Sequence, residues 1–344
     1  MVLVARRLTR LVVLGVVAAL ATGSTSSTAA DQAALSGAGS SFLLPLMTQW
    51  TAVYEGVKGV QISYNPIGSG GGIAMISARA VDFGTTDAPL TADQFTLAQG
   101  VVQIPWALSA TSIPYNLPGV TGRLHLTGPV LADIYLGNIT RWDDMCIRAI
   151  NRGLWLPSLP ITPIYRSDAS GTTFNLSDYL SHVSRTWRSK LGCATAIEFP
   201  VGVGTKPSSG VVDAILKTPG SIGYVDVAYA LKSGIPFAAI QNHSGVFTLP
   251  GLRNIAAAAS SLKKIPKNNA VSIVDPPTNK RVAYPIATFT YVVVPLITTK
   301  AATLRRFISW ALTVGQQFGP RLLFSPIPAP VLARALSTLT RISS

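Results

Sequence analysis

The sequence has few charged residues: only 12% of its 344 residues are Asp, Glu, Lys or Arg, whereas 48% are hydrophobic. Disordered chains show the opposite balance, so the composition excludes disorder and predicts a globular protein with a large buried fraction. The length suggests about two domains, with enough apolar residues for a core in each.

Histidine is scarce as well. The three histidines, His125, His182 and His243, are far apart in sequence and do not form a pattern with metal-ligand spacing. No motif pairs a nucleophile with a general base. The sequence therefore predicts no metal site, no cofactor and no catalytic centre.

The only two cysteines, Cys146 and Cys193, leave two interpretations open. In an exported chain an even pair can form a disulfide, and this is the interpretation that we favour from the sequence. The alternative is two free, buried thiols, because spacing alone does not establish the geometry of a bridge.

Acidic residues are outnumbered by basic ones, 14 against 28, which gives a formal net charge of +14. Such a charge attracts anions, acidic surfaces or nucleic acid. The basic residues are spread along the chain, however, without a long Lys/Arg block or a basic stripe studded with aromatic residues. Nucleic-acid binding is therefore not predicted.

The N-terminus has the pattern of an export signal. Residues 1–10 include three arginines, residues 11–21 are apolar but too few to span a bilayer comfortably, and small residues follow up to Ala30. We expect residues 1–30 to be removed as a signal peptide. No cysteine follows the apolar run, so no lipoprotein anchor is predicted, and we expect a soluble protein of the periplasm.

The most informative stretch is residues 166–174, Arg-Ser-Asp-Ala-Ser-Gly-Thr-Thr-Phe. An apolar run precedes it and a helical pattern follows, so we expect a turn between a strand and a helix. The first N–H groups of a helix have no intrahelical partner, Gly171 permits close approach, and the Arg166 guanidinium suits tetrahedral oxyanions. The pattern indicates an anion site. The alternative is a capped helix in which Arg166 simply pairs with Asp168.

Similar turns rich in small residues, which we call corners, occur earlier in the chain. Residues 37–42 contain Ser41 and lead into a helical pattern, and four glycines surround Ser69. Asp87 follows a strand pattern at 81–84, where α/β proteins place residues that face a ligand. Each corner has a plainer interpretation, respectively a helix N-cap at Ser40 or Ser41, a flexible loop and a turn carboxylate.

Strand and helix patterns alternate along the chain, which predicts the α/β class. Thr91 and Gln94 have the spacing of a capping box, and residues 263–280 are polar enough to predict a loop. The expected strands include 101–105, 110–115 and 287–296, and the expected helices include 128–136, 304–314 and 331–339.

Six motifs then occur in a fixed order: Gly37-Ala-Gly-Ser-Ser-Phe42, Gly68-Ser-Gly-Gly-Gly72, Val81-Asp-Phe-Gly-Thr-Thr-Asp-Ala-Pro-Leu90, Asp133-Ile-Tyr-Leu-Gly137 with Trp142, Arg166-Ser-Asp-Ala-Ser-Gly-Thr172 and Pro219-Gly-Ser-Ile-Gly-Tyr224. In this order they resemble the periplasmic phosphate-binding protein of phosphate ABC importers. The last hundred or so residues match that family only loosely. Two positions depart from it: Leu43-Leu44-Pro45 replaces a proline directly after Phe42, and Thr205 replaces a glycine.

The resemblance implies a type II periplasmic-binding fold. Such a fold has two α/β lobes, each a sheet flanked by helices, which two crossovers join and whose cleft holds the phosphate. Lobe I would comprise residues 35–115 plus 287–344, and lobe II residues 116–286.

The resemblance also implies which residues bind the ligand. Asp168 would orient Arg166, and Asp87 would accept a hydrogen bond from the proton on hydrogen phosphate, which sulfate lacks at neutral pH. The full implied set is Ser41, Phe42, Ser69, Asp87, Arg166, Ser170, Gly171 and Thr172.

The function implied by the resemblance is that of an extracytoplasmic substrate-binding protein. It would be monomeric when soluble, capture inorganic phosphate and deliver it to the permease subunits of an ABC importer. Two alternatives stay open. One is a phosphate sensor or scavenger without a transport role, and the other is a phosphatase on the same scaffold, against which the scattered histidines count.

Overall fold

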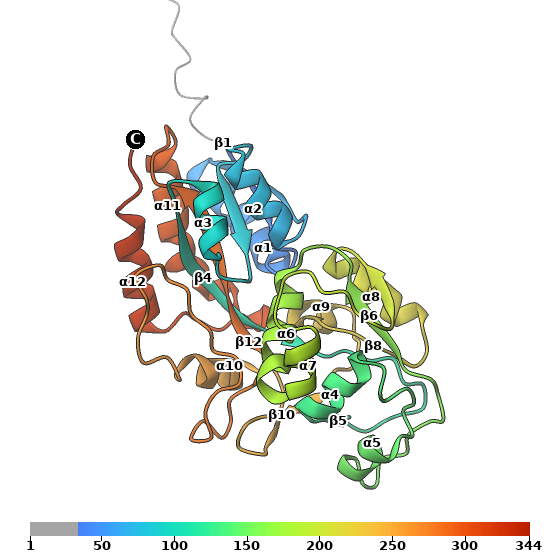
Figure 1. The fold of residues 1–344 in the computed structure, drawn as a ribbon. Coiled ribbons are helices and arrows are strands. Elements are labelled where there is room, and N and C mark those ends of the chain that lie inside the picture. Colours follow the sequence, from blue (N-terminus) through green and yellow to red (C-terminus); the bar gives the residue numbers. More distant parts are fainter. Residues whose placement is uncertain (1–33) are drawn as a thin grey trace, which may run out of the picture. The chain divides into compact units, whose positions relative to one another are not determined.

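A computed structural model describes residues 34–344 of the chain, and the expected signal peptide at residues 1–30 lies outside them (Figure 1). The strands are β1 (Ala34–Gly39), β2 (Gln61–Asn65), β3 (Phe83–Thr86), β4 (Val101–Ser112), β5 (His125–Leu126), β6 (Thr162–Arg166), β7 (Val203–Thr205), β8 (Ser221–Ile222), β9 (Val225–Asp226), β10 (Ala239–Gln241), β11 (Phe247–Thr248) and β12 (Ala287–Pro295). The α-helices are α1 (Leu44–Lys58), α2 (Ser69–Ser77), α3 (Ala92–Ala98), α4 (Gly128–Tyr135), α5 (Met145–Ile150), α6 (Gly171–Val183), α7 (Arg185–Lys190), α8 (Ser208–Lys217), α9 (Val227–Lys232), α10 (Leu252–Ala259), α11 (Ala301–Leu312) and α12 (Ala329–Leu339).

The largest sheet has the strand order β2-β1-β3-β12-β4-β9. Strand β1 pairs in parallel with both β2 and β3, whereas β12 is antiparallel to β3 and β4. Because parallel strands end at the same edge of a sheet, the residues that follow β1 and β3 meet there. The sheet thereby brings Ser40 and Ser41, which follow β1, to Asp87, which follows β3.

Two three-stranded sheets, β11-β10-β5 and β7-β6-β8, are built entirely from the middle of the chain. Strand β6 pairs in parallel with β7 on one side and β8 on the other. It ends at Arg166, and α6 begins five residues later at Gly171. This strand–turn–helix unit is the one expected from residues 166–174.

Strands β4 and β12 are the longest in the described part of the chain and pair from Val101 opposite Pro295 to Ala110 opposite Ala287. The sequence predicted two strands in the β4 region, which is wrong, since β4 runs without a break through Pro105. A register shift between Thr290 and Tyr291 of β12 accompanies Pro105. A bulge of this kind is where a sheet tolerates a residue that lacks an N–H group.

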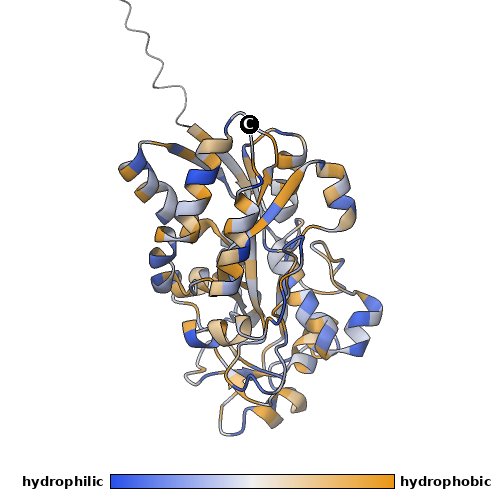
Figure 2. Ribbon diagram, turned by 90° about the vertical axis from the view of Figure 1, so that its left-hand side faces the viewer, coloured by the Kyte–Doolittle hydropathy of each residue, from blue (hydrophilic) through white to orange (hydrophobic). Residues whose placement is uncertain are grey.

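Apolar side chains fill the space between the large sheet and its helices, and Figure 2 shows hydrophobic residues concentrated along the strands. Trp106 of β4 packs against Trp50 of α1 and Phe307 of α11, with ring centroids 5.1 Å and 6.0 Å apart. Fully burying such large aromatic side chains stabilises a fold by about 2–3 kcal/mol each. This core fixes where α1 begins, and hence the position of Ser41.

The α/β prediction is confirmed by these elements. Thr91 and Gln94 form the expected capping box at the start of α3. The N-cap prediction for α1 is wrong, because its N-cap is Leu43 and no side chain caps it. Ser40 Oγ, which lies outside the helix, accepts from the Leu43 backbone N–H at 3.2 Å and donates its own hydrogen to Asp87.

The expected lobe boundaries at 115/116 and 286/287 stay a prediction. They lie beyond the paired ends of β4 and β12, where two adjacent strands leave the large sheet. Within residues 34–344, none of the helices has the length and apolar character needed to cross a membrane.

Candidate functional site

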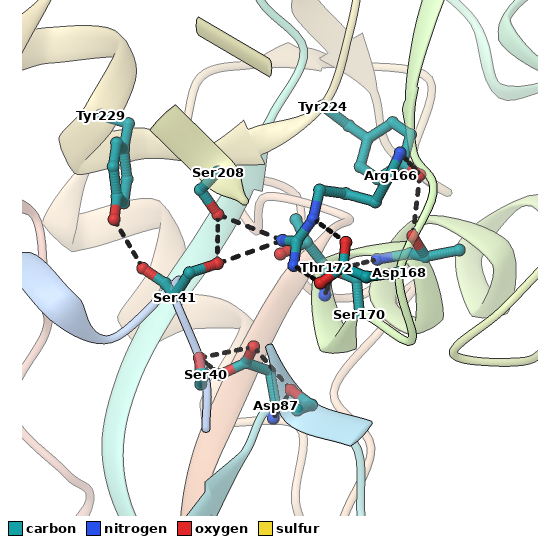
Figure 3. A network of polar contacts seen from close by, with 12 residues as sticks. Ser40, Ser41, Asp87, Arg166, Asp168, Ser170, Thr172, Ser208, Tyr224 and Tyr229 are labelled. Carbon is teal, nitrogen blue, oxygen red and sulfur yellow. Dashed lines mark hydrogen bonds and ion pairs between the residues drawn. The ribbon is translucent and has the colours of Figure 1, made fainter. Parts of the chain in front are cut away.

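Four helices begin around one cluster of polar side chains. Figure 3 shows part of this cluster, with Ser41, Thr172 and Ser208 from three of the helix starts. Ser41 precedes α1, Ser69 opens α2, Thr172 lies in the first turn of α6, and Ser208 opens α8. All four side chains are buried. The first N–H groups of each helix lack intrahelical acceptors and carry the positive end of the helix dipole, so their convergence favours an anion.

Arg166 lies at the centre of this cluster, and its side chain is only 1% exposed. Its Nε donates to Asp168 Oδ1 at 2.6 Å, and its Nη2 pairs with Asp168 Oδ2. Its Nη1 donates to Ser41 Oγ at 3.1 Å. Tyr224 Oη accepts from the Arg166 backbone N–H at 2.9 Å. Asp168 therefore orients the guanidinium so that Nη1 faces Ser41.

Asp87 is buried and accepts hydrogen bonds from three hydroxyls. Ser40 Oγ lies 2.6 Å and 2.8 Å from its two carboxylate oxygens, Thr290 Oγ1 lies 3.0 Å from Oδ1, and Ser69 Oγ lies 3.3 Å from Oδ2. Burial raises the pKa of Asp87 to about 6, since water is withdrawn from the ionised form. The three hydroxyls and Arg166 oppose this shift.

The start of α6 supplies two different hydroxyls. Ser170 Oγ caps the helix by accepting from the backbone N–H groups of Thr172 and Thr173 at 3.1 Å and 3.4 Å. Thr172 Oγ1 is buried and has no hydrogen-bond partner in the part of the chain that the structure describes. Because an unpaired buried hydroxyl is costly, Thr172 has the properties of a group that is satisfied by a ligand.

Two glycines allow the parts of the site to approach one another. A Cβ on Gly171 would lie 2.6 Å from Asp87 Cβ and 2.6 Å from Ser69 Oγ. Gly68 has a φ of +92°, and a Cβ there would lie 2.5 Å from Asp168 Oδ2. Side chains at either position would separate the Asp87 corner from the Arg166 corner.

Charge within the site is not positive overall, because the carboxyl groups of Asp87 and Asp168 outnumber the guanidinium of Arg166. An anion is therefore favoured here by converging N–H and O–H donors rather than by net charge. The Asp87 carboxylate repels an oxyanion unless a proton lies between them. The arrangement consequently suits a small oxyanion that carries a hydrogen.

The structure brings together the residues expected from the sequence. Ser41 contacts Arg166, and Ser69 contacts Asp87. The plainer interpretation of residues 166–174 is confirmed, because Ser170 caps α6 and Asp168 pairs with Arg166, whereas the anion site stays a prediction. Phe42 contributes only backbone here, since its buried ring packs against Phe324 at 6.1 Å between centroids.

Three polar residues of the cluster were not predicted as site residues. Ser40 was expected only as a possible cap of a helix, Thr290 lies inside an apolar strand, and Ser208 opens helix α8. A signal existed for Thr290, because Thr288 and Thr290 lie on one face of the otherwise apolar, fully buried β12. Polar residues at such positions indicate a buried partner.

The disulfide that we favoured from the sequence is contradicted by the structure. Cys146 and Cys193 are both free and both exposed, so the alternative of two buried thiols is wrong in its burial as well. Cys146 lies on α5, whereas Cys193 follows α7, with its Sγ 3.8 Å from the carbonyl oxygen of Phe174 in α6. The two residues thus belong to different helical segments. Among residues 34–344, no group of three or more His, Cys, Asp or Glu is placed to hold a metal ion.

Comparison with known sequences identifies a family. A family model described as the PBP superfamily domain matches residues 23–314. The phosphate-binding protein PstS of Xylella fastidiosa is 41% identical over 298 residues, which cover 86% of this chain and 81% of that protein. The phosphate-binding protein PstS of Pasteurella multocida is 35% identical over 306 residues, with coverage of 87% and 88%.

Solved structures give the same fold. A high affinity periplasmic phosphate-binding protein, bound with phosphate at pH 8.5, superposes with a TM-score of 0.71. It is 19% identical in sequence, and the match covers 88% of this chain and 93% of that one. The two-lobed α/β fold expected from the sequence is therefore confirmed.

Proposed function

The chain belongs to the PBP superfamily and, within it, to the family of the phosphate-binding proteins PstS, and we propose that it captures inorganic phosphate and delivers it to an ABC importer. One observation carries this proposal: the two sides of the site meet. Ser41 contacts Arg166, and Gly171 lies against Asp87 and Ser69. The phosphate-binding set is then Ser41, Phe42, Ser69, Asp87, Arg166, Ser170, Gly171 and Thr172.

Binding exchanges contacts within the site for contacts to phosphate oxygens. Arg166 Nη1 donates to the anion in place of Ser41 Oγ, and the Thr172 hydroxyl gains the acceptor that it otherwise lacks. Backbone N–H groups at Phe42, Ser69 and Gly171 lie at helix starts, where they have no intrahelical acceptor. The proposal thus assigns donors to the anion from both expected lobes.

Asp87 selects the protonation state of the ligand. As a carboxylate it accepts a hydrogen bond from the P–OH group of hydrogen phosphate. Fully ionised sulfate offers no such hydrogen and would place two anionic oxygens against each other. A buried polar group that is left unpaired in this way rejects the wrong ligand by orders of magnitude.

Entry of phosphate requires the two sides of the site to separate. Several hydrogen bonds join them, including Gly70 N–H to Ala169 O at 2.9 Å and Tyr229 Oη to Ser41 O at 2.7 Å. Such contacts describe a closed arrangement, and their loss would open the cleft by a hinge at β4 and β12. Export, removal of residues 1–30, a monomeric state in the periplasm and docking to permease subunits complete the proposal.

Calorimetric titration of the mature protein with phosphate, arsenate and sulfate tests this function. We expect a one-to-one complex with phosphate and no detectable heat with sulfate at neutral pH. Absence of phosphate binding would overturn the proposal. Turnover of an aryl phosphate would support the phosphatase alternative, and normal phosphate uptake by cells that lack this protein would support a sensor or scavenger.

A further inference from the structure

Ser208 occupies a position in the site that the family resemblance does not assign. It is the first residue of the ten-residue helix α8 and is 1% exposed. Its Oγ lies 2.7 Å from Ser41 Oγ and 3.2 Å from Arg166 Nη1 (Figure 3). Both of these partners belong to the proposed phosphate-binding set, so Ser208 lies directly beside the anion position.

Ser208 Oγ, Ser41 Oγ and Arg166 Nη1 form a triangle of mutual contacts, and the hydrogens within it can be counted. Arg166 Nη1 carries two hydrogens, of which one is donated to Ser41 Oγ and the other to Ser208 Oγ. Between the two serines one hydroxyl donates and the other accepts. Two hydroxyl hydrogens are therefore present but only one is used, so one donor has no acceptor within the triangle.

A surplus donor beside a guanidinium favours an anionic oxygen, because charge-assisted hydrogen bonds are the stronger ones. The helix adds to this preference, since the free N–H groups and positive dipole end of α8 lie at Ser208. Contacts among Ser208, Ser41 and Arg166 alone would leave one serine hydroxyl hydrogen without an acceptor.

We propose that Ser208 is a further phosphate-contacting residue, which donates its hydroxyl hydrogen to the phosphate oxygen that Arg166 Nη1 and Ser41 also bind. This inference rests on the proposed function. It adds a second helix start of the expected lobe II, α8 beside α6, to the residues that enclose the anion. When the two sides close, Ser208 thereby adds one more hydrogen-bond donor to the anion.

The test compares Ser208→Ala with Ser209→Ala, whose side chain is exposed on the same turn. Phosphate Kd is measured by calorimetry, and the environment of bound phosphate by its 31P chemical shift. We expect Ser208→Ala to raise Kd about tenfold or more and to move the 31P shift. Ser209→Ala should change neither, and Ser208→Thr, which keeps the hydroxyl, should restore most of the affinity.

Tyr229→Phe separates direct contact from a role in closure alone. This variant removes the hydrogen bond to the Ser41 carbonyl and leaves every donor that faces the anion in place. If Ser208→Ala weakens binding only as much as Tyr229→Phe does and leaves the 31P shift unchanged, Ser208 is a closure contact and the inference is wrong. An unchanged Kd for folded Ser208→Ala would also overturn it, whereas failure of the wild-type protein to bind phosphate would overturn the proposed function itself.

Discussion

Arg166 Nη1 lies 3.1 Å from Ser41 Oγ, although 125 residues separate the two in sequence. Arg166 ends a strand of a small sheet, and Ser41 follows the first strand of the large sheet. The contact joins the two halves of the site, and Asp168 fixes its geometry by holding the other edge of the guanidinium. Substitutions on either side of this contact are therefore expected to have specific effects on phosphate binding and on stability.

Replacing Arg166 by alanine should weaken phosphate binding severely. The change removes a buried charged donor and leaves Asp168 without its partner, which typically costs about 2–5 kcal/mol, or roughly thirty-fold and upward in Kd. Titration calorimetry measures the effect. Arg152→Ala, at an exposed position, is the matched control and should bind like the wild type. A near-wild-type Kd for Arg166→Ala would remove this residue from the site.

Asp87→Asn should weaken discrimination against sulfate. An asparagine amide can donate to an oxyanion that has no hydrogen, whereas the Asp87 carboxylate can only accept. We expect the ratio of sulfate Kd to phosphate Kd to fall by about tenfold or more. Asp213→Asn changes the same atoms at an exposed position and should leave the ratio unchanged. Equal ratios in wild type and Asp87→Asn would contradict the role given to Asp87.

The stability of the phosphate-free protein should fall as pH rises from about 4 to about 6. Burial raises the pKa of Asp87 to about 6, so in this range the folded state keeps a proton that the unfolded state has released. The contribution of Asp87 to the free energy of unfolding is fully present when the pH lies below the pKa of the unfolded state. It is lost as the pH rises to the pKa of the folded state. Its size is on the order of 3 kcal/mol, from a shift of about two units.

Urea unfolding over this pH range measures the slope, and Asp87→Asn is the reference. Asp226 is also buried, and burial raises its pKa as well, so only the difference between wild type and variant reports on Asp87. We expect that difference to fall between about pH 4 and about pH 6 and to stay constant at higher pH, where Asp87 is ionised in both states. If the free energies of unfolding of wild type and Asp87→Asn changed with pH in parallel, the raised pKa of Asp87 would be contradicted.

Gly171→Ala should impair binding without destabilising the fold. Its Cβ would lie 2.6 Å from Asp87 Cβ and Ser69 Oγ, so the two sides of the site could not meet as they do here. Alanine is also the better helix former, by up to about 1 kcal/mol. We expect a phosphate Kd raised at least about tenfold with thermal stability retained. Gly251→Ala meets nothing within 4 Å and provides the control; equal affinities of the two variants would refute the close contact.

Local sequence determined the elements and several of their details. The capping box of Thr91 and Gln94, the strand–turn–helix unit around Arg166 and the loop at 263–280 depend on neighbours a few residues away, and all three were predicted. The motif order also identified Ser41, Ser69, Asp87 and Arg166 as one set. Short-range propensity and spacing suffice for such features.

Tertiary structure alone decided the remaining contacts. Ser40 Oγ accepts from the Leu43 N–H near the start of α1, and it also donates to Asp87, which the pairing of β1 with β3 brings beside it. Ser208 reaches Ser41 only because two helices from distant segments begin at the same point. Cys146 and Cys193 stay unbridged because packing assigns them to different helical segments. Contacts between residues far apart in sequence depend on how whole sheets and helices pack, which no local pattern encodes.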